Sequence, residues 1–257
     1  MRTAQWNDAV SVIDRVTLVL GAFRAEDKRL GVSELARRAN LPKSTVSRLV
    51  SELVEHRYLE RDGSGVRPGL RLFELGELAT QPKELRSLAL ATMTDLRDAT
   101  GQSVNLAVLE GGEVVYIGML RGRNAARVPA RVGGRLPAHT TGVGKALLAF
   151  SSEEIVEGVI EGGLAGPQPG SITDPDVLRR ELEAVRETGL AYDREESGRG
   201  ILCVASPILK SGYGPIAAIS VSGRSGLLDV KNVGPAVRTA ALGLGRHLPA
   251  RALSWPL

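Results

Sequence analysis

The sequence predicts an α+β protein with a small helical N-terminal domain and a larger domain of strands and helices. Residues 33–40 (SELARRAN) and 41–53 (LPKSTVSRLVSEL) have the pattern of two helices joined by a tight turn. Residues 57–69 (RYLERDGSGVRPG) hold two short extended runs around an Asp62-Gly63 turn, which is the pattern of a wing. From residue 103 the apolar period changes from helical to strand-like. A chain of 257 residues has room for one small and one medium domain, each with a core.

The two helices of the pair are predicted to pack against each other. Asn40 lies where the turn must be, because asparagine tolerates the left-handed conformation, and Pro42 suits the first position of the second helix. An apolar pattern at residues 12, 13, 16 and 20 predicts a third helix ahead of the pair. The predicted contact faces consist of Leu35, Ala36 and Ala39 in the first helix, and of Val46, Leu49, Val50 and Leu53 in the second.

The outer face of the second helix predicts double-stranded DNA as a partner. Between Lys28 and Arg71 the chain has ten basic residues against five acidic ones. Cations and hydroxyls without an acid among them suit phosphates and base edges. The alternative is an ordinary solvated helix face, which the third helix and the wing disfavour. The predicted DNA contacts are Lys43, Ser44, Thr45, Ser47 and Arg48 in the helix, with Arg61 and Arg67 in the wing.

Two helices are predicted to link the domains. The first begins near Leu70 and stops before Pro82, and the second carries an apolar stripe from Leu85 to Ala99 and ends at Gly101. We therefore expect a DNA-binding domain over residues 1–70, a helical linker over 71–100, an effector-binding domain over 101–250 and a tail over 251–257.

The larger domain alternates strands with helices. Runs 103–109 and 113–119 flank a Gly111-Gly112 turn, and runs 201–209 and 215–223 flank a turn around Gly212 and Gly214. Ser151 with Glu154 has the spacing of a capping box, and Pro175 after Thr173-Asp174 opens a helix that Gly189 ends. A final apolar helix runs through residues 237–244. The pattern predicts a sheet covered by helices.

Composition narrows the class of protein. A hydrophobic content of 43%, a charged content of 24% and a net charge of +4 are ordinary for a globular protein and agree with an anionic partner. The single cysteine, Cys203, excludes a disulfide within one chain and favours a reducing compartment. We find neither a signal peptide nor a membrane span, so we expect a cytoplasmic protein, and no motif predicts a cofactor or a metal.

Four segments carry a resemblance to a known family: residues 41–49, 132–150, 189–201 and 204–223. In this order they resemble the IclR family of bacterial transcription regulators over nearly the whole chain. The resemblance implies a winged helix-turn-helix, a helical linker and a GAF-like mixed α/β effector domain. It also implies homodimers, often paired into tetramers, that bind a promoter palindrome and respond to a small metabolite. The wing departs from the family pattern at Pro68, which predicts a short or edge strand.

The residues also predict a cavity for a small carboxylate. Ser220 and Ser222 are two apart on one strand and so face the same side, and Cys203 lies on the strand before. Free amides of Gly142, Val143 and Gly144 precede a helix, at the positive end of its dipole. In resembling regulators that bind two- and three-carbon oxo acids, an Asp, a Cys and two Ser line the pocket. These match Asp193, Cys203, Ser220 and Ser222.

The alternative for these positions is structural, because strand serines often bond backbone and a buried cysteine is usually a small hydrophobe. An ionised Asp193 would repel an anionic ligand unless it met a hydroxyl or a cation, for which Arg194 is the candidate. The five arginines between Arg121 and Arg135 suit either the attraction of an anion or a solvated loop or subunit contact.

Besides a regulator, two other classes of protein remain open: an enzyme and an architectural DNA-binding protein. Residues 142–146 (GVGKA) lack the first glycine and the final Ser or Thr of a phosphate loop, which disfavours a nucleotide site. Cys203 with His139 would suit a thiol hydrolase, although no orienting residue completes the set. An architectural DNA-binding protein without a ligand is the third class. We favour a regulator, more often a repressor in this family, whose effector changes the orientation of two DNA-reading helices and so the operator affinity.

Overall fold

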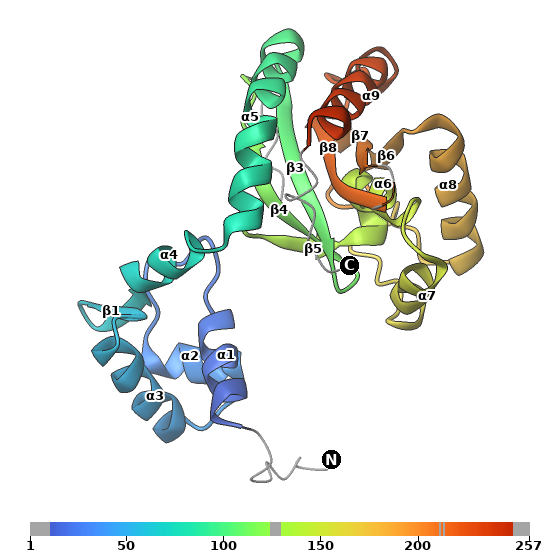
Figure 1. Ribbon diagram of the computed structural model, residues 1–257. Coiled ribbons are helices and arrows are strands. Elements are labelled where there is room, and N and C mark those ends of the chain that lie inside the picture. Colours follow the sequence, from blue (N-terminus) through green and yellow to red (C-terminus); the bar gives the residue numbers. More distant parts are fainter. Residues whose placement is uncertain (1–10, 124–129, 211, 213, 249–257) are drawn as a thin grey trace. The chain divides into compact units, whose positions relative to one another are not determined.

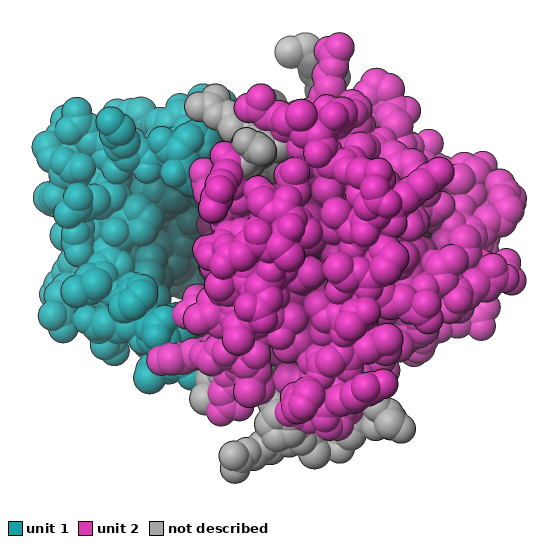
Figure 2. All heavy atoms as spheres, turned by 90° about the horizontal axis from the view of Figure 1, so that it is seen from above, with its two compact units in different colours: residues 1–79 teal, residues 80–257 magenta. Residues whose placement is uncertain are grey.

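The computed structural model describes residues 11–123, 130–210, 212 and 214–248, and the predicted tail over 251–257 lies outside these. The chain divides into two compact units, residues 1–79 and 80–257, which Figure 2 colours separately. The predicted linker is therefore shared, since its first helix belongs to the first unit and its second to the other. The prediction of an α+β fold is confirmed.

The first unit is built on a three-helix core. Its elements are α1 (Val12–Gly21), α2 (Val32–Ala39), α3 (Lys43–Glu55), β1 (Leu59–Asp62), β2 (Gly65–Pro68) and α4 (Leu70–Gly76) (Figure 1). All seven predicted contact residues of α2 and α3 are buried. Asn40 adopts the predicted left-handed conformation, with φ of 51°. Pro42 is the residue before α3 rather than its first residue, since its ψ of 137° is extended.

The prediction for α1 is partly wrong. Val12 and Ile13 are exposed, and the buried member of this helix is Val19. The capping box of Ser11 and Asp14 starts the helix at Val12, so both residues belong to its first turn. The core contacts come from farther along the helix, where Val16 and Leu20 are partly buried as predicted.

The wing is a two-stranded antiparallel sheet as predicted. β1 and β2 pair from Leu59 with Pro68 to Asp62 with Gly65, and Gly63 in the turn has φ of 57°. Pro68 ends a strand of four residues, which agrees with the expected short strand. The other edge of β2 forms an isolated bridge between Val66 and Leu30, so the wing is anchored on the core.

The second unit is a six-stranded sheet with helices on both faces. Its elements are α5 (Thr80–Thr100), β3 (Ser103–Glu110), β4 (Glu113–Leu120), β5 (Arg135–Pro137), the 3₁₀ helix η1 (Ala138–Thr140), α6 (Gly142–Leu148), α7 (Glu153–Glu161), α8 (Pro175–Thr188), β6 (Ala191–Arg194), β7 (Ile201–Lys210), β8 (Gly214–Arg224) and α9 (Val230–His247). The strand order is β5-β4-β3-β8-β7-β6, with every neighbouring pair antiparallel.

Alternation along β3 and β8 divides the sheet into two cores. The large residues Val104, Leu106, Ile219 and Val221 face α5 and α9. The residues between them are small or polar and face α6, α7 and α8, which cover the other side of the sheet (Figure 1). Small side chains allow α6 to lie close to the strands, and this face holds the candidate site.

The predicted helix boundaries are confirmed in part. The first linker helix, α4, ends at Gly76 and so stops before Pro82 as predicted, and Pro82 itself lies in the first turn of α5, where a proline costs no hydrogen bond. Ser152 precedes α7 without a side-chain cap, whereas Ser151 Oγ bonds the carbonyl of Leu147. Asp174 and Gly189 begin and end α8 as predicted. No helix among the described residues has the length and hydrophobicity to cross a bilayer.

Candidate functional site

The N-terminal half of α3 presents cations and hydroxyls and no acid. Lys43, Ser44, Ser47 and Arg48 are exposed and Thr45 is half-buried. Lys43 and Arg48 form no ion pair with any residue that the structure describes, so both charges are available to an anion. The acids of this helix come later in the chain, at positions 52 and 55.

The two wing arginines differ in their surroundings. Arg67 lies opposite Glu60 on the hairpin and bonds its carboxylate, with Nη2 to Oε2 at 3.1 Å. Arg61 pairs with Val66 in the register, on the other side of the hairpin, and is exposed. Arg61 therefore offers a free charge, whereas Arg67 must share its charge with Glu60.

Other cations of this unit stabilise the fold. Arg38 bonds Asp27 at 2.6 Å and Glu34 at 2.8 Å, and also donates to the carbonyl of Ala22. Hydrogen bonds from Arg37 and Arg38 lower the pKa of Glu34 to about 2. The basic excess seen in the sequence is thus only partly available to DNA.

In the second unit, sheet register brings three predicted effector residues into one row. Asp193 on β6 pairs with Cys203 on β7, and Cys203 pairs with Ser222 on β8. Residues aligned in this way point to the same face of a sheet. Ser220, two residues earlier on β8, shares that face and pairs with Asn105 on β3.

These residues line a small enclosed cavity. Its volume is about 20 Å³, room for about one water molecule. Asn105 Nδ2 donates to Ser222 Oγ at 3.0 Å and to Ser220 Oγ at 3.3 Å. The structure brings together six of the seven predicted effector residues here: Gly142, Val143, Asp193, Cys203, Ser220 and Ser222.

Gly144 does not line the cavity. Its amide donates to Thr141 Oγ1 at 3.0 Å as part of the cap of α6, so the predicted free amide is already used. Gly142 and Gly144 belong to the first turn of α6 rather than preceding it. A Cβ on Gly142 would lie 3.2 Å from Cys203 Sγ, and one on Gly144 would collide with the carbonyl of Ala138. Close packing therefore requires a glycine at position 144, whereas at position 142 a Cβ would be in tight contact with Cys203.

Asp193 is held by its own loop. Its Oδ1 accepts from the amides of Glu196 at 2.7 Å and Ser197 at 3.3 Å, and its Oδ2 accepts from Ser197 Oγ at 2.5 Å. Burial raises the pKa of this carboxyl above its ordinary value, and these bonds oppose the shift. Arg194 is not the partner that the sequence suggested, because its guanidinium bonds Glu181 and covers the ring of Tyr192.

Cys203 lacks the properties of a nucleophile. The thiol is buried, and burial raises its pKa to about 12, so it stays protonated at neutral pH. His139 lines a different cavity, and its Nε2 lies 2.9 Å from the carbonyl of Ala165. Within the described residues no group of His, Cys, Asp and Glu is arranged to hold a metal.

A buried ion pair supports the cavity and was not predicted. Lys145 on α6 is fully buried, and its Nζ bonds both carboxylate oxygens of Glu196 at 2.7 and 2.8 Å and Glu181 at 3.2 Å. The amide of Glu196 in turn holds Asp193. In the sequence, Lys145 belongs to the segment GVGKA, which resembles a phosphate loop. The acidic pair at positions 195 and 196, just after Asp193, is the sequence signal for the partner of Lys145.

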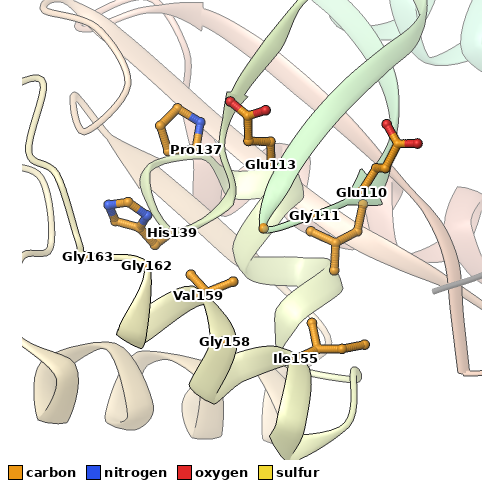
Figure 3. Close-up of a pocket in the computed structure, with 12 residues that line it drawn as sticks. Glu110, Gly111, Glu113, Pro137, His139, Ile155, Gly158, Val159, Gly162 and Gly163 are labelled. Atoms are coloured by element: carbon orange, nitrogen blue, oxygen red, sulfur yellow. The ribbon is translucent and has the colours of Figure 1, made fainter. Parts of the chain in front are cut away.

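A larger cavity of about 490 Å³ lies at the turn between β3 and β4 (Figure 3). Leu109, Ile155 and Val159 contribute its apolar walls, and the lining also includes Pro137, His139 and glycines of the β3–β4 turn and of α7 and its C-terminal end. Glu110 and Glu113 stand near its rim, and both bond Arg135. Arg127 lies outside the described residues, so the predicted run of five arginines is described only in part.

Comparison with known proteins agrees with this architecture. The IclR helix-turn-helix domain matches residues 12–63, and the model of the bacterial transcriptional regulator IclR C-terminal domain matches residues 78–246. The chain belongs to the IclR family. The resemblance inferred from the four segments is thereby confirmed.

Curated IclR relatives span the chain almost completely. The HTH-type transcriptional regulator XynR of Escherichia coli K12 is 31% identical over 245 residues, which cover 93% of this chain and 97% of XynR. The transcriptional repressor AllR of the same strain is 34% identical over 247 residues, which cover 91% of each chain. These relatives are named as regulators rather than as enzymes.

Solved IclR structures have the same fold. An IclR homolog from Microbacterium hydrocarbonoxydans, complexed with 4-hydroxybenzoate, has a TM-score of 0.82 and 35% identity, and the match covers 92% of this chain and 98% of that one. The Thermotoga maritima IclR has a TM-score of 0.72 and 28% identity over 91% and 97% of the two chains. The helix-turn-helix domain implies DNA as a partner, and the IclR effector domain implies a small molecule.

Proposed function

We propose that this IclR-family regulator is a repressor whose affinity for a palindromic operator is set by a small carboxylate bound beneath α6. The observation that carries the proposal is the convergence of Asp193, Cys203, Ser220 and Ser222 on one cavity. Two hydroxyls, a thiol and the first turn of a helix offer several hydrogen-bond donors to an anion.

The ligand class has support from one relative. The Microbacterium homolog was solved with 4-hydroxybenzoate, which is a carboxylate. The raised pKa of Asp193 supports the same class, because a carboxyl that is more easily protonated repels an anion less. The cavity holds about 20 Å³ before any side chain moves, so a bound acid must be small and its binding must displace some of the lining side chains.

On DNA, a homodimer would bind the two half-sites of the operator. The α3 helix of one subunit would enter the major groove of one half-site, and that of the other subunit would enter the second. Lys43, Ser44, Thr45, Ser47 and Arg48 would make the helix contacts, and Arg61 and Arg67 would contact flanking backbone. Homodimers, and their pairing into tetramers, belong to this proposal. The exposed apolar residues of α1 and α4, which include Ile13 and Phe73, supply a surface for such assembly.

The effector is tested by thermal unfolding of the full chain with glyoxylate, pyruvate and benzoate. We expect a saturable rise in Tm with at least one acid. The Ser220→Ala, Ser222→Ala double variant should lose this rise. Ser206→Ala is the matched control, because Ser206 is a buried serine of the same sheet that bonds the carbonyl of Gly189 and does not line the cavity. A rise that survives in the double variant would refute the site.

The DNA contacts are tested by selection from a random duplex pool, followed by titration of the enriched sequence. We expect an inverted repeat, and Arg48→Ala should weaken binding about tenfold or more while leaving the acid-induced Tm rise unchanged. Arg180→Ala, an exposed arginine of α8, is the control. Equal affinity of Arg48→Ala and wild type would remove α3 from the interface.

A further inference from the structure

Asn105 is a buried amide that lacks a partner on one side. The residue is 3% exposed, on β3, and it lines the effector cavity. Its Nδ2 donates to the two serine hydroxyls, whereas its Oδ1 is buried and accepts no hydrogen bond from any residue that the structure describes. Buried polar atoms without a partner are uncommon in folded proteins, so this acceptor needs an explanation.

The direction of these bonds determines what the cavity offers. Because Nδ2 donates to Ser220 and Ser222, it uses an acceptor position of each hydroxyl, and the hydroxyl protons can be donated to a ligand or, from Ser220, to the sulfur of Cys203. Oδ1 can only accept, and so can an ionised Asp193. The cavity therefore combines serine donors with amide and carboxylate acceptors.

A carboxylate without a hydroxyl can bond the serine donors of the cavity but not its acceptors. It would take the serine protons but supply no donor to Asn105 Oδ1, and would face Asp193 with like charge. A hydroxyl next to the carboxylate of the ligand would supply the donor that Asn105 Oδ1 lacks. A ligand that displaces the single water that fits here must replace its hydrogen bonds or lose affinity.

We propose that Asn105 is a specificity-determining residue that accepts a hydrogen bond from a hydroxyl of the effector, and that the effector is a hydroxy carboxylic acid. This inference rests on the proposed effector cavity. It divides the ligand between two groups of residues, with the carboxylate on Ser220 and Ser222 and the hydroxyl on Asn105.

The test compares acids that differ by one hydroxyl. Glycolate is paired with acetate and lactate with propanoate, and dissociation constants are measured by calorimetry on the full chain. In wild type we expect the hydroxy acid of at least one pair to bind about tenfold more tightly than its deoxy partner. Asn105→Leu, which has a similar volume and no acceptor, should reduce the ratio to about one.

Asn105→Asp is the second variant, because it keeps an acceptor oxygen at the same position. We expect weaker binding of both acids, from added negative charge, with the preference for the hydroxy acid retained. Thermal unfolding of each variant shows whether it is folded, and the wild-type ratio tests the inference even if a variant does not fold.

The outcomes separate this inference from the function on which it rests. Equal binding of both acids in each pair by wild type would overturn the role of Asn105 and leave the carboxylate cavity standing. An unchanged preference in folded Asn105→Leu would also overturn it. Failure of all four acids to bind would overturn both.

Discussion

Single residues in the second unit illustrate how burial changes chemistry. Lys145 carries a charge with no access to water, and the structure compensates it with Glu196 and Glu181. His139 is also buried, and burial lowers its pKa below the ordinary value. Both residues lie within a few positions of Gly142 and Val143, which line the cavity, so both belong to the scaffold around it.

Removal of the lysine charge should destabilise the protein strongly. Lys145→Met leaves Glu196 buried without its cation, and we expect the free energy of unfolding to fall by about 3–5 kcal/mol. The Lys145→Met, Glu196→Gln double variant removes both charges, keeps the acceptor for the amide of Arg194, and should recover at least half of the loss. Urea unfolding measures both values. A free energy of unfolding for Lys145→Met within about 1 kcal/mol of the wild-type value would contradict the buried charge pair.

Stability should also depend on pH through His139. Its folded pKa is lowered, so below pH 6.5 the unfolded chain takes up a proton that the folded chain does not, and stability falls as the pH falls. Between pH 7.5 and 5.5, wild type should lose more stability than His139→Gln, by up to about 1 kcal/mol. His56 and His247 are present in both proteins and cancel in the comparison. Parallel profiles would show that His139 does not contribute.

At the scale of elements, the packing of α6 on the sheet defines the cavity. Gly142 allows the helix to approach Cys203, and Gly144 allows it to approach η1. The capped first turn of α6 lies directly over the row from Asp193 to Ser222. Any change that lifts α6 therefore alters both the fold and the site.

Alanine substitution distinguishes the glycines that are required from those that are not. Gly144→Ala should lower stability by about 2–3 kcal/mol, because the new methyl group meets the backbone of Ala138. Gly158→Ala on α7 meets no atom within 4 Å and should raise Tm slightly, since alanine favours a helix. Thermal unfolding compares the two. A neutral Gly144→Ala would mean that α6 and η1 are less closely packed than described.

At the scale of the whole molecule, the first unit leaves large apolar side chains in water. Ile13 is 76% exposed on α1, and Leu70 and Phe73 are 63% and 64% exposed on α4. We propose that these side chains contribute to a contact between subunits, since large apolar residues exposed in one small unit can mark an interaction site. The palindromic operator of the proposal requires such a contact, since its two half-sites are read by two subunits.

Charges placed on this surface should dissociate the protein. We expect wild type to elute with twice the chain mass or more in size-exclusion chromatography with light scattering. The Ile13→Glu, Phe73→Glu double variant should shift to the monomer mass and lose affinity for the full operator. Leu227→Glu, a 60% exposed position in the second unit, is the control. A double variant that remains dimeric would place the interface elsewhere.

The sequence by itself determined the class of the fold, the helix-turn-helix with its wing, and most of the cavity. Short-range patterns carry this information: helical spacing on α2 and α3, an Asp-Gly turn, and two serines two apart on a strand. Pairing of consecutive strands then brought Cys203 beside Ser222. The resemblance added Asp193.

Only the tertiary structure decided which of these groups are free to act. Asn105 reaches Ser220 across 115 positions of sequence, and Lys145 meets Glu196 across 51, so no local pattern could pair them. The same holds for Arg67, which Glu60 engages, and for Gly144, whose role is to pass close to Ala138. A charge, an amide or a hydroxyl is available to a ligand only if no neighbour already binds it. Because tertiary packing brings these neighbours together from distant parts of the sequence, only the tertiary structure determines which groups of the site are available.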